Sequence, residues 1–330
     1  MKKILIGLDV GNHDVKTQST ITPSGFSESL NASFSNSGCL HYGDYYYSLD
    51  PLSRFSYTMD KTINNKCFIL SLFGIAKEII YQITKKENNL SQNEIQKRIQ
   101  EITTVNLGIG LPPTHCATLS EKNIRYYTDN FSSGIHFNFD GYNFALKLGC
   151  CKVFAQDFAA ITAYALNKKL KNSIIQEFDT YYAIDIGGWT VDIVSMMNGQ
   201  PSIRQCDSKP LGVLKMYDEI ISYVEKDAGI RLTPVNIEDV LKGKATILDD
   251  EIKEMIKDKA LKWFHLIIGE LRQFGVDFDI YPAIFLGGGS LLFQDFIYQS
   301  KISKKYEILS NIHANADGYA KLLRLSMKKS

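Results

Sequence analysis

One short pattern occurs twice in this chain and limits its possible folds more than any other feature. An aliphatic run ends at residues 9–12 (DVGN), and another ends at residues 185–188 (DIGG), 176 residues later. Each glycine-containing turn leads into a second predicted strand, beginning at Val15 and at Val191. Two strands joined by a tight turn, repeated half a chain apart, predict two similar β-hairpins in two related domains.

Composition narrows the class of protein. The chain has 330 residues, of which 45% are apolar and 22% charged, as expected for a soluble protein of two ordinary domains. Its net charge of +1 argues against a dedicated nucleic-acid surface. The first apolar run is interrupted at Asp9, and no stretch reaches the roughly 18 apolar residues that span a bilayer. We therefore expect a cytoplasmic protein with neither a membrane nor a direct nucleic-acid partner.

Strands and helices alternate through both halves, which predicts an α/β fold. A capping box at Ser91 and Glu94 marks the start of one of the helices. The predicted strands cover residues 3–8, 42–49, 103–109, 151–154, 180–186, 191–197 and 283–286, and the predicted helices cover residues 67–84, 91–101, 156–170, 212–227, 249–274 and 318–327.

The two predicted hairpins have the composition of a polyphosphate site. Backbone N–H groups at such turns bind anions, and glycine lets the chain approach phosphate oxygens closely. Asp9 and Asp185, at the strand ends, could hold hydrated Mg²⁺, which leans on one or two carboxylates. Lys16 could neutralise charge on the β- and γ-phosphates. A single D-x-G turn is more often structural punctuation, so this prediction depends on the repeat.

A third glycine-rich turn follows late in the chain. Residues 285–290 (FLGGGS) read as a strand that enters a three-glycine turn. Alone, this segment could equally be a loose connection between a strand and a helix. The sequence contains neither a G-x-x-x-x-G-K-[ST] phosphate loop nor a G-x-G-x-x-G motif.

In this order, the three turns resemble the phosphate-1, phosphate-2 and adenosine motifs of the actin superfamily, which includes heat-shock chaperones and sugar kinases. Residues 108–112 (GIGLP) and 315–319 (NADGY), together with the chain length, are similar to bacterial and archaeal actin-like proteins of the ParM type. The resemblance implies an actin-like fold with two related domains, each a mixed β-sheet flanked by helices, and a nucleotide cleft between them.

The resemblance also implies domain limits. Domain I would comprise residues 1–165 and 312–330, with the first phosphate hairpin and a small subdomain around 30–65. Domain II would comprise residues 166–311, with the second phosphate hairpin, the adenosine motif and a helical subdomain around 210–275.

Site residues follow from the resemblance as well. Asp9 and Asp185 would lie near Mg²⁺, through water, and near the attacking water. Gln156, at the start of the helix that links the domains, would position that water, with neighbouring Asp157 as the alternative; Gln156 could instead be only a polar residue at a helix start. The expected nucleotide contacts are Gly11, Asn12, His13 and Lys16 from the first hairpin, Gly187, Gly188, Trp189 and Thr190 from the second, braced by Asp192, and Gly287, Gly288, Gly289 and Ser290 from the third turn.

Two residues depart from the family pattern. Trp189 occupies a turn position that often holds a small residue, and His13 is unusual in the first turn. Either residue could alter nucleotide closure or exchange.

The function implied by the resemblance is an ATPase, acting on ATP or GTP with Mg²⁺, that polymerises head-to-tail. Its filaments would segregate plasmid DNA through a DNA-binding adaptor of the ParR type. Two alternatives remain at this point: a small-molecule kinase or phosphatase of the same superfamily, and a chaperone-like or cell-division scaffold.

Overall fold

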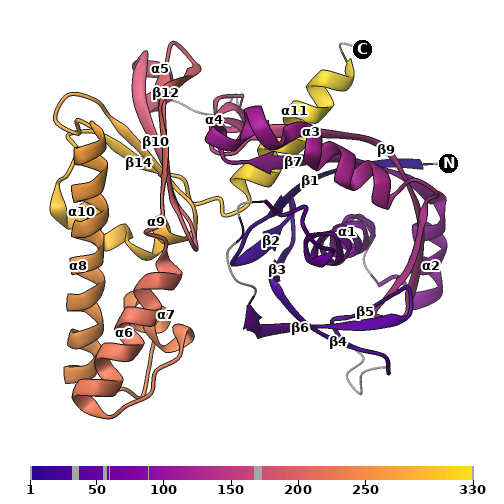
Figure 1. Cartoon of the computed structure of the whole chain (residues 1–330), viewed down its shortest axis with the longest axis horizontal. Coiled ribbons are helices and arrows are strands. Elements are labelled where there is room, and N and C mark those ends of the chain that lie inside the picture. The colour runs from indigo at the N-terminus through magenta and orange to yellow at the C-terminus, as the bar shows by residue number, and fades with distance from the viewer. Residues whose placement is uncertain are drawn as a thin grey trace. The chain divides into compact units, whose positions relative to one another are not determined.

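The computed structural model describes residues 2–31, 37–54, 58, 60–87, 89–166 and 173–328. These residues form two compact units (Figure 1): unit 1 comprises Met1–Leu166 and His313–Ser330, and unit 2 comprises Asn167–Ile312. Parts of the expected small subdomain around 30–65, and residues 167–170 of the helix expected over 156–170, lie outside the described residues.

Unit 1 contains a nine-stranded mixed sheet that curves around one central helix, α1 (Lys66–Thr84) (Figure 1). Its strand order is β3-β2-β1-β7-β9-β8-β5-β6-β4. The strands are β1 (Lys2–Val10), β2 (Asp14–Lys16), β3 (Ile21–Pro23), β4 (Gly25–Ser29), β5 (Cys39–Tyr42), β6 (Tyr45–Arg54), β7 (Ile102–Leu111), β8 (Ile135–Phe139) and β9 (Tyr142–Ala155).

Helix α1 is the core of unit 1, because apolar residues surround it on almost every side. Phe68, Leu72, Phe73 and Ile75 are each at most 1% exposed. By length and composition alone, α1 could also span a membrane. The sequence analysis expected no segment of that kind, and α1 is an exception to that expectation. Most of its most apolar stretch is buried within the unit, as in the core helix of a globular protein.

The other helices of unit 1 are α2 (Gln92–Glu101), α3 (Pro113–Asn130), α4 (Phe158–Ala165) and α11 (Ala314–Lys328). Helix α11 packs tightly on β1 and α4: a methyl group added at Gly7 would lie 1.8 Å from the Ala316 carbonyl oxygen, and one added at Gly318 would lie 2.3 Å from that of Ala159. The two segments similar to ParM-type proteins meet here, because Tyr319 lies directly against Gly108 and Gly110.

The predicted capping box at the start of α2 is confirmed. The Ser91 hydroxyl accepts a hydrogen bond from the Glu94 amide, and the Glu94 carboxylate accepts one from the Ser91 amide. Replacing Ser91 with alanine is expected to lower the free energy of unfolding by about 1 kcal/mol. Urea denaturation measures this change. Gln92→Ala, one residue later on the exposed surface, is the matched control and should change stability by less than about 0.5 kcal/mol; equal effects of the two variants would contradict the assignment.

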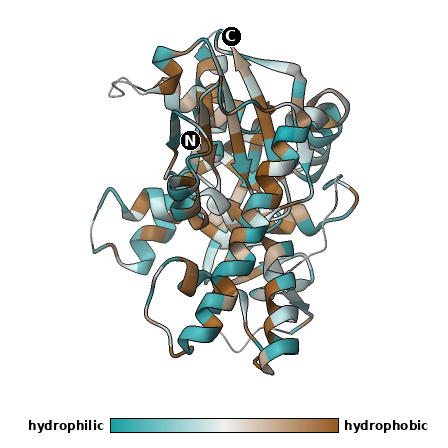
Figure 2. Cartoon of the chain, turned by 90° about the vertical axis from the view of Figure 1, so that its left-hand side faces the viewer, coloured by the Kyte–Doolittle hydropathy of each residue, from teal (hydrophilic) through white to brown (hydrophobic). Residues whose placement is uncertain are grey.

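Unit 2 contains a five-stranded sheet in the order β12-β11-β10-β13-β14. Its strands are β10 (Thr180–Ile186), β11 (Val191–Met197), β12 (Gln200–Lys209), β13 (Ala283–Leu286) and β14 (Tyr306–Ile308), and its helices are α5 (Ile174–Glu177), α6 (Val213–Ala228), α7 (Pro234–Leu241), α8 (Asp250–Phe274), α9 (Gly288–Leu292) and α10 (Gln294–Ser300). Hydrophobic and hydrophilic bands alternate along its longer helices in Figure 2. The apolar stripe of α8, which includes Trp263, Phe264 and Ile267, is buried in the core of this unit.

Both units contain the same five-strand arrangement. In unit 1, β1, β2 and β3 form an antiparallel meander, and β7 and β9 add to the other side of β1 in parallel. In unit 2, β10, β11 and β12 form the same meander, and β13 and β14 add in parallel beside β10. The repeated sequence pattern therefore reflects a repeated topology.

Several elements differ from the sequence prediction. Helix α4 begins at Phe158 rather than at 156, and α11 begins at Ala314 rather than at 318. Helix α3 and the β8–β9 hairpin were not predicted. The hairpin turn is an Asp140-Gly141 pair with positive φ at both residues, a strong hairpin signal that could have revealed it.

Candidate functional site

The two repeated hairpins are closed by equivalent hydrogen bonds. The Gly11 amide donates to the Asp14 carbonyl over 3.0 Å, and the Gly187 amide donates to the Thr190 carbonyl over 2.9 Å. The preceding aspartates occupy equivalent positions, with Asp9 opposite Lys16 and Asp185 opposite Asp192. The same turn thus follows the same strand in each unit.

The second hairpin turn rests on the first residues of α6. The carbonyls of Gly187, Gly188 and Trp189 accept hydrogen bonds of 2.9–3.1 Å from the amides of Val213, Leu214 and Gly212, respectively. In a trans peptide unit the N–H points opposite to the C=O. The amides of residues 188–190 are therefore directed away from α6, as in an anion-binding concavity.

Ser24 plays the corresponding part at the first hairpin. Its hydroxyl donates to the Gly11 carbonyl over 2.6 Å, and its amide donates to the His13 carbonyl over 3.0 Å. By the same geometry, the amides of residues 12 and 14 point away from Ser24. His13 itself is oriented by Asp14, whose carboxylate lies 2.7 Å from His13 Nδ1.

Trp189 does not fill the turn with its bulk. Its indole is partly buried and packs against the apolar core of unit 2. Gly212 is the residue that this turn requires to be small, because a methyl group there would lie 2.3 Å from the Gly188 carbonyl oxygen. Sequence analysis identified Gly212 only as a helix start and did not identify Ser24.

In the third turn, only Gly287 and Gly288 are accessible. Gly289 and Ser290 are buried, and the Ser290 hydroxyl donates to the Leu286 carbonyl. Gly287, with φ +86°, lies directly against Asp185: an added methyl group would lie 2.0 Å from Asp185 Oδ1. The glycine at this position therefore makes room for the carboxylate.

Gln156 lies beside Asp9. Its side-chain Nε2 donates to Asp9 Oδ1 over 3.3 Å, and the residue sits in the turn between β9 and α4. Asp157 is fully buried, and its amide donates to Asn315 Oδ1 of α11 over 2.8 Å. Of the two alternatives from sequence, Gln156 is the one whose side chain contacts Asp9.

The donor set suits a hydrated magnesium ion better than a protein-only metal site. The described residues contain no cluster of three or more His, Cys, Asp or Glu side chains. Asp9 and Asp185 are each partly accessible. Magnesium usually keeps several waters and takes one or two carboxylates plus substrate phosphates, so the aspartate of either hairpin could contribute one carboxylate to such a site.

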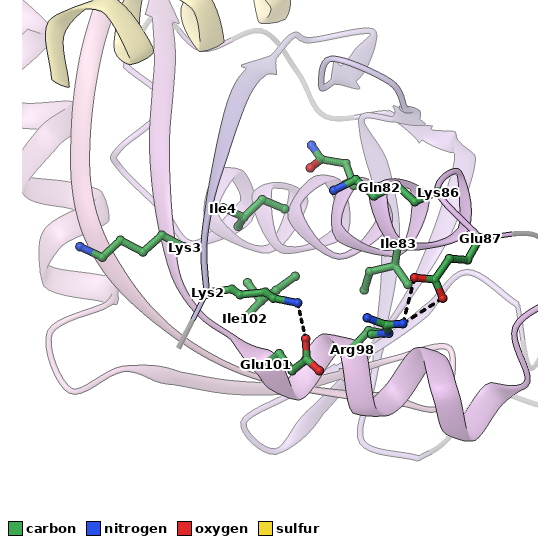
Figure 3. A pocket seen from close by; sticks show the side chains of 10 residues that line it. All are labelled: Lys2, Lys3, Ile4, Gln82, Ile83, Lys86, Glu87, Arg98, Glu101 and Ile102. Carbon is green, nitrogen blue, oxygen red and sulfur yellow. Dashed lines mark hydrogen bonds and ion pairs between the residues drawn. The ribbon is translucent and has the colours of Figure 1, made fainter. Parts of the chain in front are cut away.

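A pocket of roughly 160 Å³ lies at the other end of β1 (Figure 3). It is lined by Lys2, Lys3, Ile4, Gln82, Ile83, Lys86, Glu87, Arg98, Glu101 and Ile102. Lys2 pairs with Glu101, and Arg98 pairs with Glu87. Six residues of extended strand separate Lys3 from Asp9, about 20 Å at the usual rise, so this pocket is distinct from the hairpin turn.

Comparison with solved structures identifies the fold. The apo pSK41 ParM protein matches with a TM-score of 0.67 at 16% identity, over 100% of this chain and 99% of its own. The archaeal actin homologue Ta0583 matches with a TM-score of 0.70 at 16% identity, over 99% of this chain and 100% of its own. This chain has the fold of the actin superfamily.

Further comparisons agree with the actin-like fold. A ParM from a 15-stranded Clostridium botulinum filament matches with a TM-score of 0.71 at 16% identity, over 98% of this chain and 100% of its own. Residues 183–299 match the model of a protein family that is described as "Archaeal actin homologue MreB-like, C-terminal". That segment contains both the second hairpin and the third turn. No curated protein sequence matches the chain.

Proposed function

We propose that this actin-like chain binds and hydrolyses ATP or GTP with Mg²⁺, and that the bound nucleotide controls its assembly into head-to-tail filaments. The observation that carries the proposal is the repeated hairpin, with its backbone amides turned outward and an aspartate at the end of each first strand. Solved structures with this fold include a Bacillus thuringiensis ParM with ATP and the Ta0583 complex with ADP.

The residues divide the work of binding. In this proposal the amides of both hairpins hold the polyphosphate, and Lys16, opposite Asp9 in the ladder, neutralises part of its charge. Asp9 and Asp185 would hold magnesium through water, and the bound ion would neutralise negative charge on the phosphate oxygens and so favour attack by water. Gly287 and Gly288 take the α-phosphate and adenosine side.

Gln156 orients the attacking water. Its amide already contacts Asp9, so a water between these groups would have both a donor and an acceptor. An amide is a poor proton acceptor, so it positions water without serving as a strong base. We therefore expect slow hydrolysis, which would set how long the triphosphate-bound state lasts.

Assembly follows from a nucleotide-dependent change in shape. Domain closure on a ligand is a common switch, and a head-to-tail interface that does not close gives open filaments. Two solved structures with this fold are described as filaments, the C. botulinum ParM and Alp12. In this proposal the filaments move plasmid DNA in the cytoplasm through an adaptor of the ParR type.

Pelleting with different nucleotides tests the proposal. Purified protein should sediment with Mg-ATP or Mg-GTP, and should remain in the supernatant with Mg-ADP or without nucleotide. Phosphate release measured in the same samples should follow assembly. Turnover stimulated by a small-molecule acceptor, by protein that never sediments, would support a kinase instead and overturn the proposal.

A further inference from the structure

A lysine outside all of the recognised motifs reaches the first hairpin. Lys61 Nζ donates a hydrogen bond to the backbone carbonyl of Val10, which lies between Asp9 and Gly11. Lys61 belongs to the connection between β6 and α1, 51 residues further along the chain. A second cation, besides Lys16, is therefore held at the base of this turn.

The connection that carries Lys61 is fixed by its neighbour Asp60. Asp60 Oδ1 accepts hydrogen bonds from the Thr62 amide and hydroxyl, at 3.0 and 2.6 Å, and Oδ2 pairs with Lys122 of α3 at 2.5 Å. Burial opposes ionisation of Asp60, but the hydrogen bonds from Lys122 and Thr62 outweigh it and lower its pKa to about 2. Asp60 is therefore charged at neutral pH and keeps this turn attached to α3.

A second attachment lies just beyond Lys61. The Tyr126 hydroxyl of α3 donates to the Asn64 carbonyl over 2.8 Å and accepts from the Phe68 amide over 3.0 Å. The backbone is thus tied to α3 on both sides of Lys61. Because the position is set in advance, less conformational entropy remains to be lost when the ammonium binds a ligand.

The Lys61 ammonium has a neutral partner. Among the described residues it forms no ion pair, and its contact is the Val10 carbonyl. Its charge still acts on its surroundings: burial, and then Lys61, lower the pKa of His115 at the start of α3. The carbonyl is a neutral acceptor, whereas a phosphate oxygen carries negative charge and also attracts the ammonium electrostatically, so a phosphate oxygen would compete well with the carbonyl.

We propose that Lys61 is a phosphate-binding residue that exchanges the Val10 carbonyl for an oxygen of the terminal phosphate of a nucleoside triphosphate. The inference rests on the proposed nucleotide site. Lys16 lies on the hairpin itself, whereas Lys61 comes from a separate connection. Its engagement would therefore couple the terminal phosphate to residues 60–65 and to the start of α1, and would favour triphosphate over diphosphate.

Calorimetric titration of full-length variants with Mg-ATP and Mg-ADP tests this role. Lys61→Ala is expected to weaken Mg-ATP binding about tenfold or more, the value of a hydrogen bond between charged groups, and to weaken Mg-ADP binding less than about threefold. Lys61→Arg keeps the charge and should retain most of the preference for ATP. Lys85→Ala, at the far end of α1, is the matched control and should bind both nucleotides as the wild type does.

The outcomes separate this inference from the proposed function. Equal weakening for both nucleotides, or none, with Lys16→Ala clearly impaired, would overturn the role of Lys61 alone. A wild-type protein that takes up neither nucleotide would overturn the proposed function and the inference together. Thermal unfolding without nucleotide detects a purely structural role: Lys61→Ala would then lose stability while keeping the wild-type ratio of ATP to ADP affinity.

Discussion

Replacing Gln156 with alanine is expected to lower the rate of nucleotide hydrolysis by about 100-fold, in the range typical for loss of a group that positions the nucleophile. Gln156 contacts Asp9 through its side chain only, so its removal leaves the hairpin backbone that we propose binds phosphate. The affinity for Mg-ATP should therefore change little, and assembled filaments should persist longer. Phosphate release and sedimentation over time measure the two effects separately.

Gln96→Ala provides the matched control for this substitution. Gln96 lies on α2, where its side chain bonds to the backbone of Asn143, far along the chain from Asp9. Its loss should leave the hydrolysis rate unchanged. Wild-type hydrolysis by Gln156→Ala would show that another group orients the water and would remove Gln156 from the mechanism.

Gly287→Ala should damage both stability and activity, whereas Gly288→Ala should keep the stability of the wild type. Alanine at position 287 would have to adopt φ +86° and would place a methyl group 2.0 Å from Asp185 Oδ1. We expect the free energy of unfolding to fall by about 1–3 kcal/mol. Hydrolysis should fall by about 100-fold, because a displaced carboxylate no longer meets its ligand in the right geometry.

The adjacent glycine makes this comparison sharp. A methyl group at Gly288 would have no heavy atom within 4 Å, and its φ is not in the left-handed region. Urea denaturation and phosphate-release assays on both variants, made in parallel, provide the measurement. If the two variants had the same stability and the same hydrolysis rate, the contact between the third turn and Asp185 would not matter for function.

Local signals explain why much of this fold could be predicted from sequence. Residues 181–184 and 283–286 are continuous apolar runs, and the glycine turns that follow them mark where each strand ends. The Ser91 capping box depends on two residues three apart. Because each of these features is decided within a few residues, sequence reasoning could find it.

Features that depend on tertiary contacts were missed. Helix α3 buries few of its side chains, chiefly Asn123 and Tyr127, so it shows almost no apolar periodicity. Ser24 and Lys61 are ordinary residues in sequence and gain their roles only because the chain returns to the first hairpin. The aspartates and glycines of the hairpins were found because their pattern is repeated.

The close packing of α11 on β1 and α4 has a consequence for how the protein folds during its synthesis. Unit 1 is discontinuous, and the Asn315 side chain that accepts a hydrogen bond from the Asp157 amide, next to Gln156, belongs to the segment that follows unit 2 along the chain. A nascent chain that still lacks this helix leaves Gly7 and Gly108 without their packing partners. Unit 1 therefore becomes complete only after all of unit 2 has been synthesised.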